Sequence, residues 1–119
     1  MARVIRPGSP VRGSKSGRPI MALLDLLGRR WALRLVWELR EGRQSFRALQ
    51  ERCSRVSPTV LNRRLGELRR AGVVAREEPT GYGLTAEGKE LLAALTPLHG
   101  WAERWSRRSR AALSGEDRF

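Results

Sequence analysis

The sequence predicts one mostly helical domain with a small β hairpin, and three observations favour this fold class. Apolar residues recur at helical spacing through most of residues 20–106. Two short apolar runs, near residues 73 and 82, flank the turn sequence Pro-Thr-Gly. The chain has 119 residues, 40% of them hydrophobic, which is enough for one core and too apolar for a wholly disordered protein.

The first two helices are predicted from apolar stripes that end at glycine. Pro19 suits the first turn of a helix, and apolar residues at helical spacing follow it as far as Gly28. The second helix is expected to end at Gly42, and one of its faces collects apolar residues at i, i+4, i+5 and i+8. Those residues are Trp31, Leu35, Val36 and Leu39.

Two amphipathic segments joined by a turn follow a brief extended stretch at residues 44–46. Residues 46–53 have apolar side chains at i, i+3 and i+7 and are expected to form the third helix. After a turn at residues 54–56, Ser57 is a favourable N-cap and Pro58 a favourable first helical residue. The fourth helix is expected to end at Gly72 and has one apolar face, formed by Leu61, Leu65 and Leu68.

A hairpin and a long helix complete the predicted domain. Residues 73–75 and 82–84 are too short for helices, and the turn between them predicts two antiparallel strands. Thr85 is expected to cap the last helix, which Pro97 should kink or divide. Two helices joined by a tight turn and followed by a hairpin form a winged helix-turn-helix. The apolar stripe of the last helix consists of Leu91, Leu95, Leu98 and Trp105.

The net charge of +12 is concentrated in two parts of the chain. Residues 1–19 hold five basic residues and no acidic one, with several prolines and glycines, so we expect a flexible basic arm. Residues 43–76 hold nine arginines against two glutamates, whereas residues 77–106 are net negative. This distribution favours a nucleic-acid partner, although codon bias in a GC-rich genome also enriches arginine. The expected units are the arm at 1–19, the folded domain at 20–106 and a flexible tail at 107–119.

The helix at residues 57–71 is the expected DNA-reading element. On a helical wheel its leucines point inward, and the opposite face is polar or basic with no acidic residue at its centre. A solvated amphipathic helix is the alternative, but the hairpin and the charge distribution favour DNA binding. We expect base contacts from Ser57, Thr59, Asn62 and Arg63, and phosphate contacts from Arg47, Arg64, Arg69, Arg70 and Arg76.

Several classes of function are excluded or disfavoured. One cysteine and one histidine cannot make a zinc site, and one cysteine cannot form an intrachain disulfide. No glycine-rich phosphate loop, nucleophile elbow or carboxylate pair indicates an enzyme, and we expect no cofactor and no metal. No apolar stretch suits a membrane span or a secretory signal, so we expect a cytoplasmic, nucleoid-associated protein.

Three stretches of the sequence carry a resemblance to a known family. They are LLGRRWALRLVWELREGRQSFRALQERC, SPTVLNRRLGELRRAGVVARE and YGLTAEGKELLAAL. Within them, a Gly-x-x-Trp motif ends at Trp31, Ser57 and Pro58 precede regularly spaced leucines, and a Tyr-x-Leu-Thr-x-x-Gly motif ends at Gly88. In this order, the residues from Met21 to about Trp105 resemble the HxlR-type family of winged helix-turn-helix transcription regulators.

The resemblance implies a homodimeric, double-stranded-DNA-binding regulator, which we expect to be a repressor controlled by an unidentified small molecule or chemical signal. It implies that the first and last helices form the dimer interface, with two recognition helices about 34 Å apart on an inverted-repeat operator. A non-specific architectural nucleic-acid-binding protein is the alternative. The expected interface residues are Leu23, Leu24, Leu27, Leu91, Leu95, Leu98, Trp101 and Trp105.

Two features depart from the family pattern. The segment at residues 77–81 is short and acidic where members often have a longer basic wing, so we do not expect it to enter the minor groove. No cysteine lies in or just before the first helix, and Cys53 shares a face with Phe46 and Leu49, which favours a buried structural thiol over a sensor. Core or interface positions are expected, rather than a ligand pocket, for Trp31, Trp37, Trp101 and Trp105.

Overall fold

The computed structural model describes residues 18–79 and 81–116. The predicted basic arm therefore lies almost wholly outside the described residues. Those residues form a winged helix-turn-helix, as predicted, with the fourth helix followed directly by the hairpin. In chain order the elements are α1 (Pro19–Leu27), α2 (Ala32–Glu38), a 3₁₀ helix (Leu39–Glu41), α3 (Phe46–Arg52), α4 (Pro58–Arg70), β1 (Val74–Glu77), β2 (Gly81–Leu84) and α5 (Ala86–Glu116).

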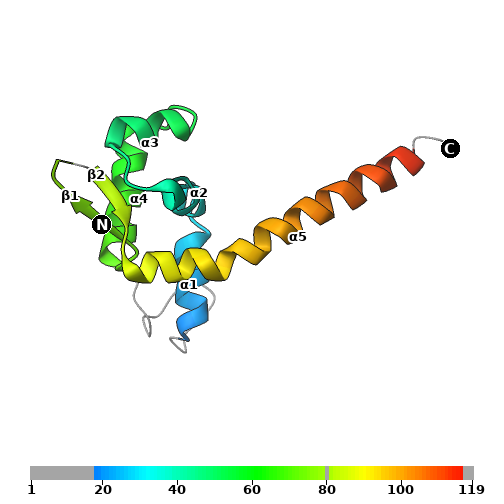
Figure 1. Ribbon diagram of the computed structural model, residues 1–119, viewed down its shortest axis with the longest axis horizontal. Coiled ribbons are helices and arrows are strands. Elements are labelled where there is room, and N and C mark those ends of the chain that lie inside the picture. Colours follow the sequence, from blue (N-terminus) through cyan, green and yellow to red (C-terminus); the bar gives the residue numbers. More distant parts are fainter. Residues whose placement is uncertain (1–17, 80, 117–119) are drawn as a thin grey trace.

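The core lies where α2, α3 and α4 meet. Figure 1 shows these helices and the hairpin gathered in one body, from which the outer part of α5 extends. The apolar faces predicted for the second, third and fourth helices all point into that body. Its fully buried side chains include Leu35, Val36, Leu39, Leu49, Cys53, Leu61, Leu65 and Leu68.

The hairpin also pairs with a backbone segment outside its two strands. Val74 pairs with Leu84 and Glu77 with Gly81 in the antiparallel ladder. Gln44, just before α3, forms an isolated bridge with Tyr82 through two backbone hydrogen bonds of 2.8 and 2.9 Å. Gly81 has a φ of +89°, and a Cβ there would overlap the Gln44 carbonyl oxygen, so glycine is required. The extended stretch predicted at residues 44–46 therefore ties the wing to α3.

The start of α5 explains the Tyr-x-Leu-Thr-x-x-Gly motif. Thr85 caps the helix, because its Oγ1 accepts a hydrogen bond from the Gly88 amide at 3.0 Å and donates one to the Gly72 carbonyl oxygen at 2.5 Å. A Cβ at Gly88 would overlap the Val73 carbonyl oxygen. Tyr82, in β2, is buried in the core. The motif thus fixes the helix against the end of α4 and the beginning of β1.

Pro97 was expected to kink or divide the last helix. It does not divide α5, which is continuous from Ala86 to Glu116, but Figure 1 shows that the helix bends along its course, in agreement with a kink. Pro97 and Ala93 are both exposed, so water can bond the Ala93 carbonyl that the proline leaves without an amide donor. The helix also continues past residue 106, because residues 107–116 are rich in Arg, Ala and Leu, which are good helix formers.

Candidate nucleic-acid interface

Helix α4 has well-defined ends that fix its register. Ser57 is the N-cap, as predicted, and its Oγ accepts a hydrogen bond from the Val60 amide at 3.2 Å. Its own O–H remains available as a donor at the exposed end of the helix. At the other end Gly72 adopts a left-handed φ of +80°, and the Val73 amide donates to the Leu68 carbonyl oxygen at 2.9 Å.

The outward face of α4 has the composition predicted from the helical wheel. Thr59, Asn62, Arg63 and Arg70 are exposed, whereas the three leucines of the helix are buried. Gly66 lies between these polar side chains, and the Arg70 guanidinium lies beside it, 3.6 Å from where a Cβ would be. This distance is an ordinary van der Waals contact, so the guanidinium packs along this face of the helix. Hydrogen-bonding groups for base edges thus lie beside cations suited to phosphates.

The predicted phosphate-binding arginines fall into two groups. Arg76 reaches the Glu78 carboxylate at 2.7 Å and lies over the Tyr82 ring, so part of its charge is already neutralised. A second group, which does not include Arg64, is exposed and makes no hydrogen bond or ion pair with any residue that the structure describes, which leaves its charge open to an external anion. That second group is Arg47, Arg69 and Arg70, joined by the predicted base reader Arg63.

Arg64 does not have the position expected of a phosphate contact. Its side chain is only 16% exposed, and its Nε donates to the Arg30 carbonyl oxygen at 2.7 Å. Its Nη1 also donates to Glu67 Oε1 at 2.9 Å. The helical wheel placed Arg64 correctly on α4, but the α1–α2 linker packs over that side of the helix. The guanidinium therefore stabilises the fold and does not face an external phosphate.

A groove separates the end of α4 from strand β1. Three arginines line it, two from the helix and one from the strand, together with small side chains that leave it open. The sequence prediction placed the arginines on separate elements and missed that they converge. Because the hairpin follows α4 after a single turn, this convergence is a property of the fold. The lining residues are Gly66, Arg69, Arg70, Val74, Ala75 and Arg76.

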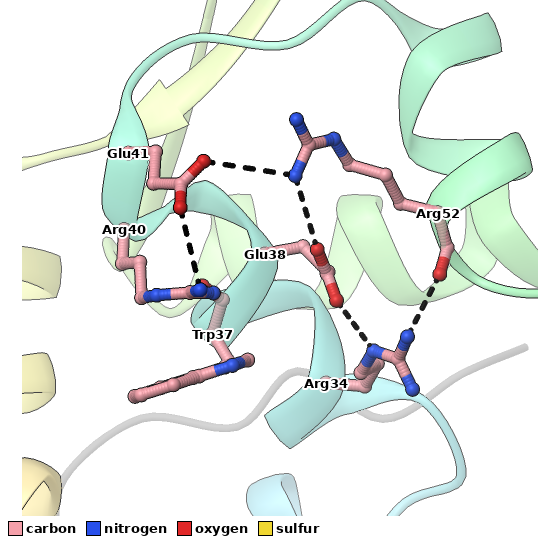
Figure 2. A network of polar contacts seen from close by, with 6 residues as sticks. All are labelled: Arg34, Trp37, Glu38, Arg40, Glu41 and Arg52. Atoms are coloured by element: carbon pink, nitrogen blue, oxygen red, sulfur yellow. Dashed lines mark hydrogen bonds and ion pairs between the residues drawn. The ribbon is translucent and has the colours of Figure 1, made fainter.

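A network of charged side chains holds α3, the first helix of the helix-turn-helix, against α2 (Figure 2). Glu38 accepts hydrogen bonds from Arg34 Nε at 2.6 Å and from Arg52 Nη1 at 3.3 Å, and Arg34 Nη2 also donates to the Arg52 carbonyl oxygen at 2.9 Å. Burial alone would raise the pKa of Glu38, but the hydrogen bonds from the two arginines outweigh it and hold the pKa below the ordinary value of 4.5. Sequence patterning did not single out this network.

The turn between α3 and α4 is tight because two consecutive residues are left-handed. Ser54 and Arg55 have φ values of +55° and +57°. The Arg55 amide donates to the Gln50 carbonyl oxygen at 2.9 Å, and the Gln50 side-chain amide donates to the Val56 carbonyl oxygen at 3.0 Å. These bonds set the angle at which α4 leaves α3.

Half of the apolar residues predicted for a dimer interface lie at the surface. Leu24, Leu98, Trp101 and Trp105 are 47–55% exposed, and the other four are partly buried. The rings of Trp101 and Trp105 stack with centroids 5.7 Å apart on the part of α5 that leaves the body. The prediction missed three further exposed apolar side chains, because it treated residues 107–119 as a tail and followed only the main stripes. These are Ile20, Leu33 and Leu113.

The remaining tryptophans lie apart from that exposed pair. Trp31 packs against the core, whereas the Trp37 ring stacks on His99 at 5.1 Å beside an apolar groove between α2 and α5. The groove has a volume of about 280 Å³. Its walls are Leu33, Val36, Trp37, Leu92, Leu95, Leu98, His99 and Ala102.

Cys53 is fully buried, as the sequence favoured. Burial raises the pKa of its thiol, and Arg34 opposes that shift only in part. The thiol is therefore protonated and shielded at neutral pH. Within residues 18–79 and 81–116, no three His, Cys, Asp or Glu side chains are grouped to hold a metal ion, and no helix is long and apolar enough to cross a membrane.

The chain is similar to known transcription regulators along most of its length. It is 36% identical over 88 residues to YvaP of Bacillus subtilis, an uncharacterized HTH-type transcriptional regulator, covering 69% of this chain and 82% of YvaP. It is also 31% identical over 87 residues to the HTH-type transcriptional regulator YodB of the same organism, covering 68% of this chain and 78% of YodB.

Solved structures agree with this similarity. The quinone-bound structure of YodB from B. subtilis superposes with a TM-score of 0.66 at 29% identity, covering 71% of this chain and 96% of that one. A structure described as a possible HxlR family transcriptional factor from Thermoplasma volcanium gives a TM-score of 0.65 at 30% identity, covering 71% and 82%. A family model described as HxlR-like helix-turn-helix matches residues 26–110. The chain therefore belongs to the HxlR-like helix-turn-helix family and is a DNA-binding transcription regulator, not an enzyme.

Proposed function

We propose that this regulator acts as a homodimer that binds an inverted-repeat operator through α4. The observation that carries the proposal is the outward face of α4, where polar side chains lie among arginines that no described residue neutralises. The helix inserts into the major groove with this face toward the bases. Occupying a promoter in this way blocks transcription, so the regulator is a repressor bound to chromosomal DNA.

Each side chain of this face has a distinct role in the proposal. Arg63 donates two parallel hydrogen bonds to a guanine, and Asn62 pairs similarly with an adenine. Ser57 and Thr59 contact bases near the start of α4. The flanking cations Arg47, Arg69, Arg70 and Arg76 bind phosphates, three of them around the groove beside β1. Arg64 is omitted, because its guanidinium is occupied inside the protein.

The dimer part of the proposal is supported by the apolar surface of α1 and α5. Large apolar side chains that are half exposed, including an indole pair, are unfavourable in water and suit a subunit interface. The outer half of α5 touches nothing else in the described chain that would cover it (Figure 1). A two-fold axis through these helices sets the two α4 helices about 34 Å apart, one turn of DNA.

Selection of bound duplexes from a randomised library, followed by competition binding, tests this proposal. The expected outcome is an inverted repeat whose half-sites lie about 10 base pairs apart centre to centre, bound at least about 10³-fold more tightly than bulk DNA. Uniform binding to all duplexes would instead indicate a non-specific architectural protein. Footprinting on the DNA that flanks its own gene then locates the natural operator.

A small-molecule signal is the second part of the proposal. Two observations support it: the relative YodB has been solved with quinone bound, and an apolar groove large enough for a small aromatic molecule lies between α2 and α5 here. The buried thiol of Cys53 argues against covalent capture at that residue. Titrating a benzoquinone and non-reactive aromatic compounds against the protein–operator complex should release DNA. Unchanged operator affinity with every compound would remove the effector from the proposal.

A further inference from the structure

Glu67 lies on the recognition helix but faces away from the DNA-reading side. Its carboxylate is 4% exposed, and each oxygen contacts a different arginine. Oε1 accepts a hydrogen bond from Arg64 Nη1, one turn earlier on α4, at 2.9 Å. Oε2 accepts one from Arg29 Nη1, which belongs to the linker between α1 and α2. A buried carboxylate paired on both sides is rigid, since losing either arginine leaves one desolvated oxygen without its hydrogen bond.

The cluster formed by Glu67, Arg64 and Arg29 makes two further contacts that hold the α1–α2 linker. Arg64 Nε donates to the Arg30 carbonyl oxygen at 2.7 Å, and Arg29 Nη2 reaches Asp25 Oδ2, on α1, at 3.3 Å. The linker is irregular, because Trp31 adopts a left-handed φ of +76° immediately before α2. Directional bonds to α4 therefore hold a segment that has no regular backbone structure of its own.

The cluster joins the two surfaces on which the proposed function depends. Helix α1 exposes Ile20 and Leu24 toward the proposed partner subunit, whereas α4 faces DNA. Apolar packing joins these helices through α2, but such packing is non-directional, whereas charged hydrogen bonds fix an angle. A small rotation of α4 relative to the dimer axis changes the separation of the two recognition helices, because the motion is repeated in both subunits.

We propose that Glu67 is a positioning residue that fixes the angle between α4 and α1, and thereby the half-site spacing that the dimer selects. This inference rests on the proposed function. It predicts a specificity effect from a side chain that touches no DNA. Glu67→Gln keeps the shape of the side chain but removes the charge that both arginines share. Its single amide oxygen cannot accept from Arg29 and Arg64 as the carboxylate does.

The chain offers a matched control in Glu38→Gln. Glu38 is also a buried carboxylate held by two arginines, Arg34 and Arg52, but its network joins α2 to α3 and does not reach the α1–α2 linker (Figure 2). The two variants therefore remove the same chemical group at similar burial. They differ in whether the lost bonds connect α4 to the linker that follows α1.

The experiment measures dissociation constants of the full chain for its selected operator and for versions with one or two base pairs added to or removed from the spacer. The wild type should prefer its own spacing by about tenfold or more, which corresponds to about 1.4 kcal/mol. Glu67→Gln should reduce that preference to about threefold or less, with affinity for bulk DNA within about twofold of the wild type. Glu38→Gln should retain the wild-type preference.

Each alternative outcome has a definite meaning. A Glu67→Gln protein that keeps the spacing preference, or a Glu38→Gln protein that loses it equally, overturns the inference in favour of a purely structural role. If Glu67→Gln does not fold, as judged by circular dichroism, Arg29→Gln removes the linker bond while leaving the Arg64–Glu67 pair within α4. A folded Arg29→Gln protein with unchanged spacing preference also overturns it. A wild-type protein with no preferred spacing overturns the proposed function itself, and this inference with it.

Discussion

Arg63 and Arg64 are neighbours on α4 with opposite environments. Arg63 is exposed, whereas the Arg64 guanidinium lies 2.7 Å from the Arg30 carbonyl oxygen and is 16% exposed. The 100° turn between successive helical residues accounts for the difference, because it takes the second arginine under the α1–α2 linker. Two side chains of identical chemistry are therefore expected to affect DNA binding in different ways.

Arg64→Ala should lower stability without removing a phosphate contact. It leaves the Arg30 carbonyl oxygen without its donor and Glu67 with one arginine, so unfolding in urea should show a loss of about 1–3 kcal/mol. The salt dependence of DNA binding should keep its slope. Arg69→Ala is the matched control, since Arg69 is exposed and its loss should reduce the slope by about 0.9 with little change in stability. If Arg64→Ala also reduced the slope of the salt dependence, Arg64 would have to contact a phosphate after all.

Arg63→Ala should weaken operator binding and blur base preference. We expect a loss of about 1–3 kcal/mol on the selected operator and a broader set of accepted bases at one position of each half-site. The free energy of unfolding should stay unchanged, because Arg63 makes no hydrogen bond or ion pair with a described residue. Repeating the library selection with the variant checks both statements. An unchanged preferred sequence would show that another face of α4 meets the bases.

Glu38 should make part of the stability depend on pH. Its pKa in the folded protein lies below the ordinary value of 4.5, so its stabilising effect is complete above the unfolded-state pKa and disappears as pH falls through the folded-state pKa. Glu38→Gln should therefore be less stable than the wild type at pH 7, and the difference should shrink below about pH 4.5. Urea unfolding across this range measures it.

Exposed Glu51, 3.6 Å from Arg55, is the control for that experiment. An exposed ion pair of this kind contributes little, so Glu51→Gln should match the wild type at every pH. A difference between Glu38→Gln and the wild type that is constant from neutral to acid pH would contradict the role assigned to the charge of Glu38.

The elements that the sequence located correctly carry local signals. Ser57 and Pro58 mark the beginning of α4 and Gly72 its end, and each acts within a few residues of its own position. The predicted first strand began one residue early, because β1 starts at Val74. Val73 belongs instead to the turn after α4, where its amide donates a hydrogen bond to the Leu68 carbonyl oxygen. Element types and faces were therefore predictable, whereas boundaries depended on hydrogen bonds that patterning does not reveal.

What the sequence could not reveal depends on residues far apart in the chain. Arg29 and Glu67 are 38 positions apart, and nothing in the spacing of either segment pairs them. On the wheel Glu67 appears as a flanking acid and Arg64 as a flanking base, because a wheel shows angle without showing what packs against it. The prediction for the end of α5 failed for the opposite reason. Good helix formers after residue 106 were present in the sequence, but the prediction of a tail at residues 107–119 did not take them into account.

The basic arm remains a prediction from composition alone. Removing residues 2–17 deletes four basic side chains and no acidic one, so affinity for operator and bulk DNA should fall together at low salt. The midpoint of thermal unfolding should barely move. An arm with its basic residues replaced by glutamine should behave like the deletion, whereas a shuffled arm of the same composition should behave like the wild type. A large fall in the melting temperature would indicate that the arm contributes to the fold.

Trp101 and Trp105 lie one helical turn apart on the outer part of α5, and their rings stack while each side chain remains about half exposed. Stacking covers only one face of each indole, so about half of their surface still faces water. Burial of both side chains against a second copy of the chain removes that surface from water. The free energy gained is several times the roughly 1.5 kcal/mol that burial of one small apolar side chain contributes.

Replacing both tryptophans by alanine should therefore convert the proposed dimer to a monomer in sedimentation experiments. Operator affinity should fall with it, because one recognition helix offers too few contacts for a specific site. The matched control is Glu103→Ala with Arg107→Ala, an exposed pair at the same spacing on the opposite side of α5, which leaves the net charge unchanged. The control should remain a dimer. A double tryptophan variant that also remains a dimer would move the interface to α1, where Ile20 and Leu24 are the most exposed apolar side chains.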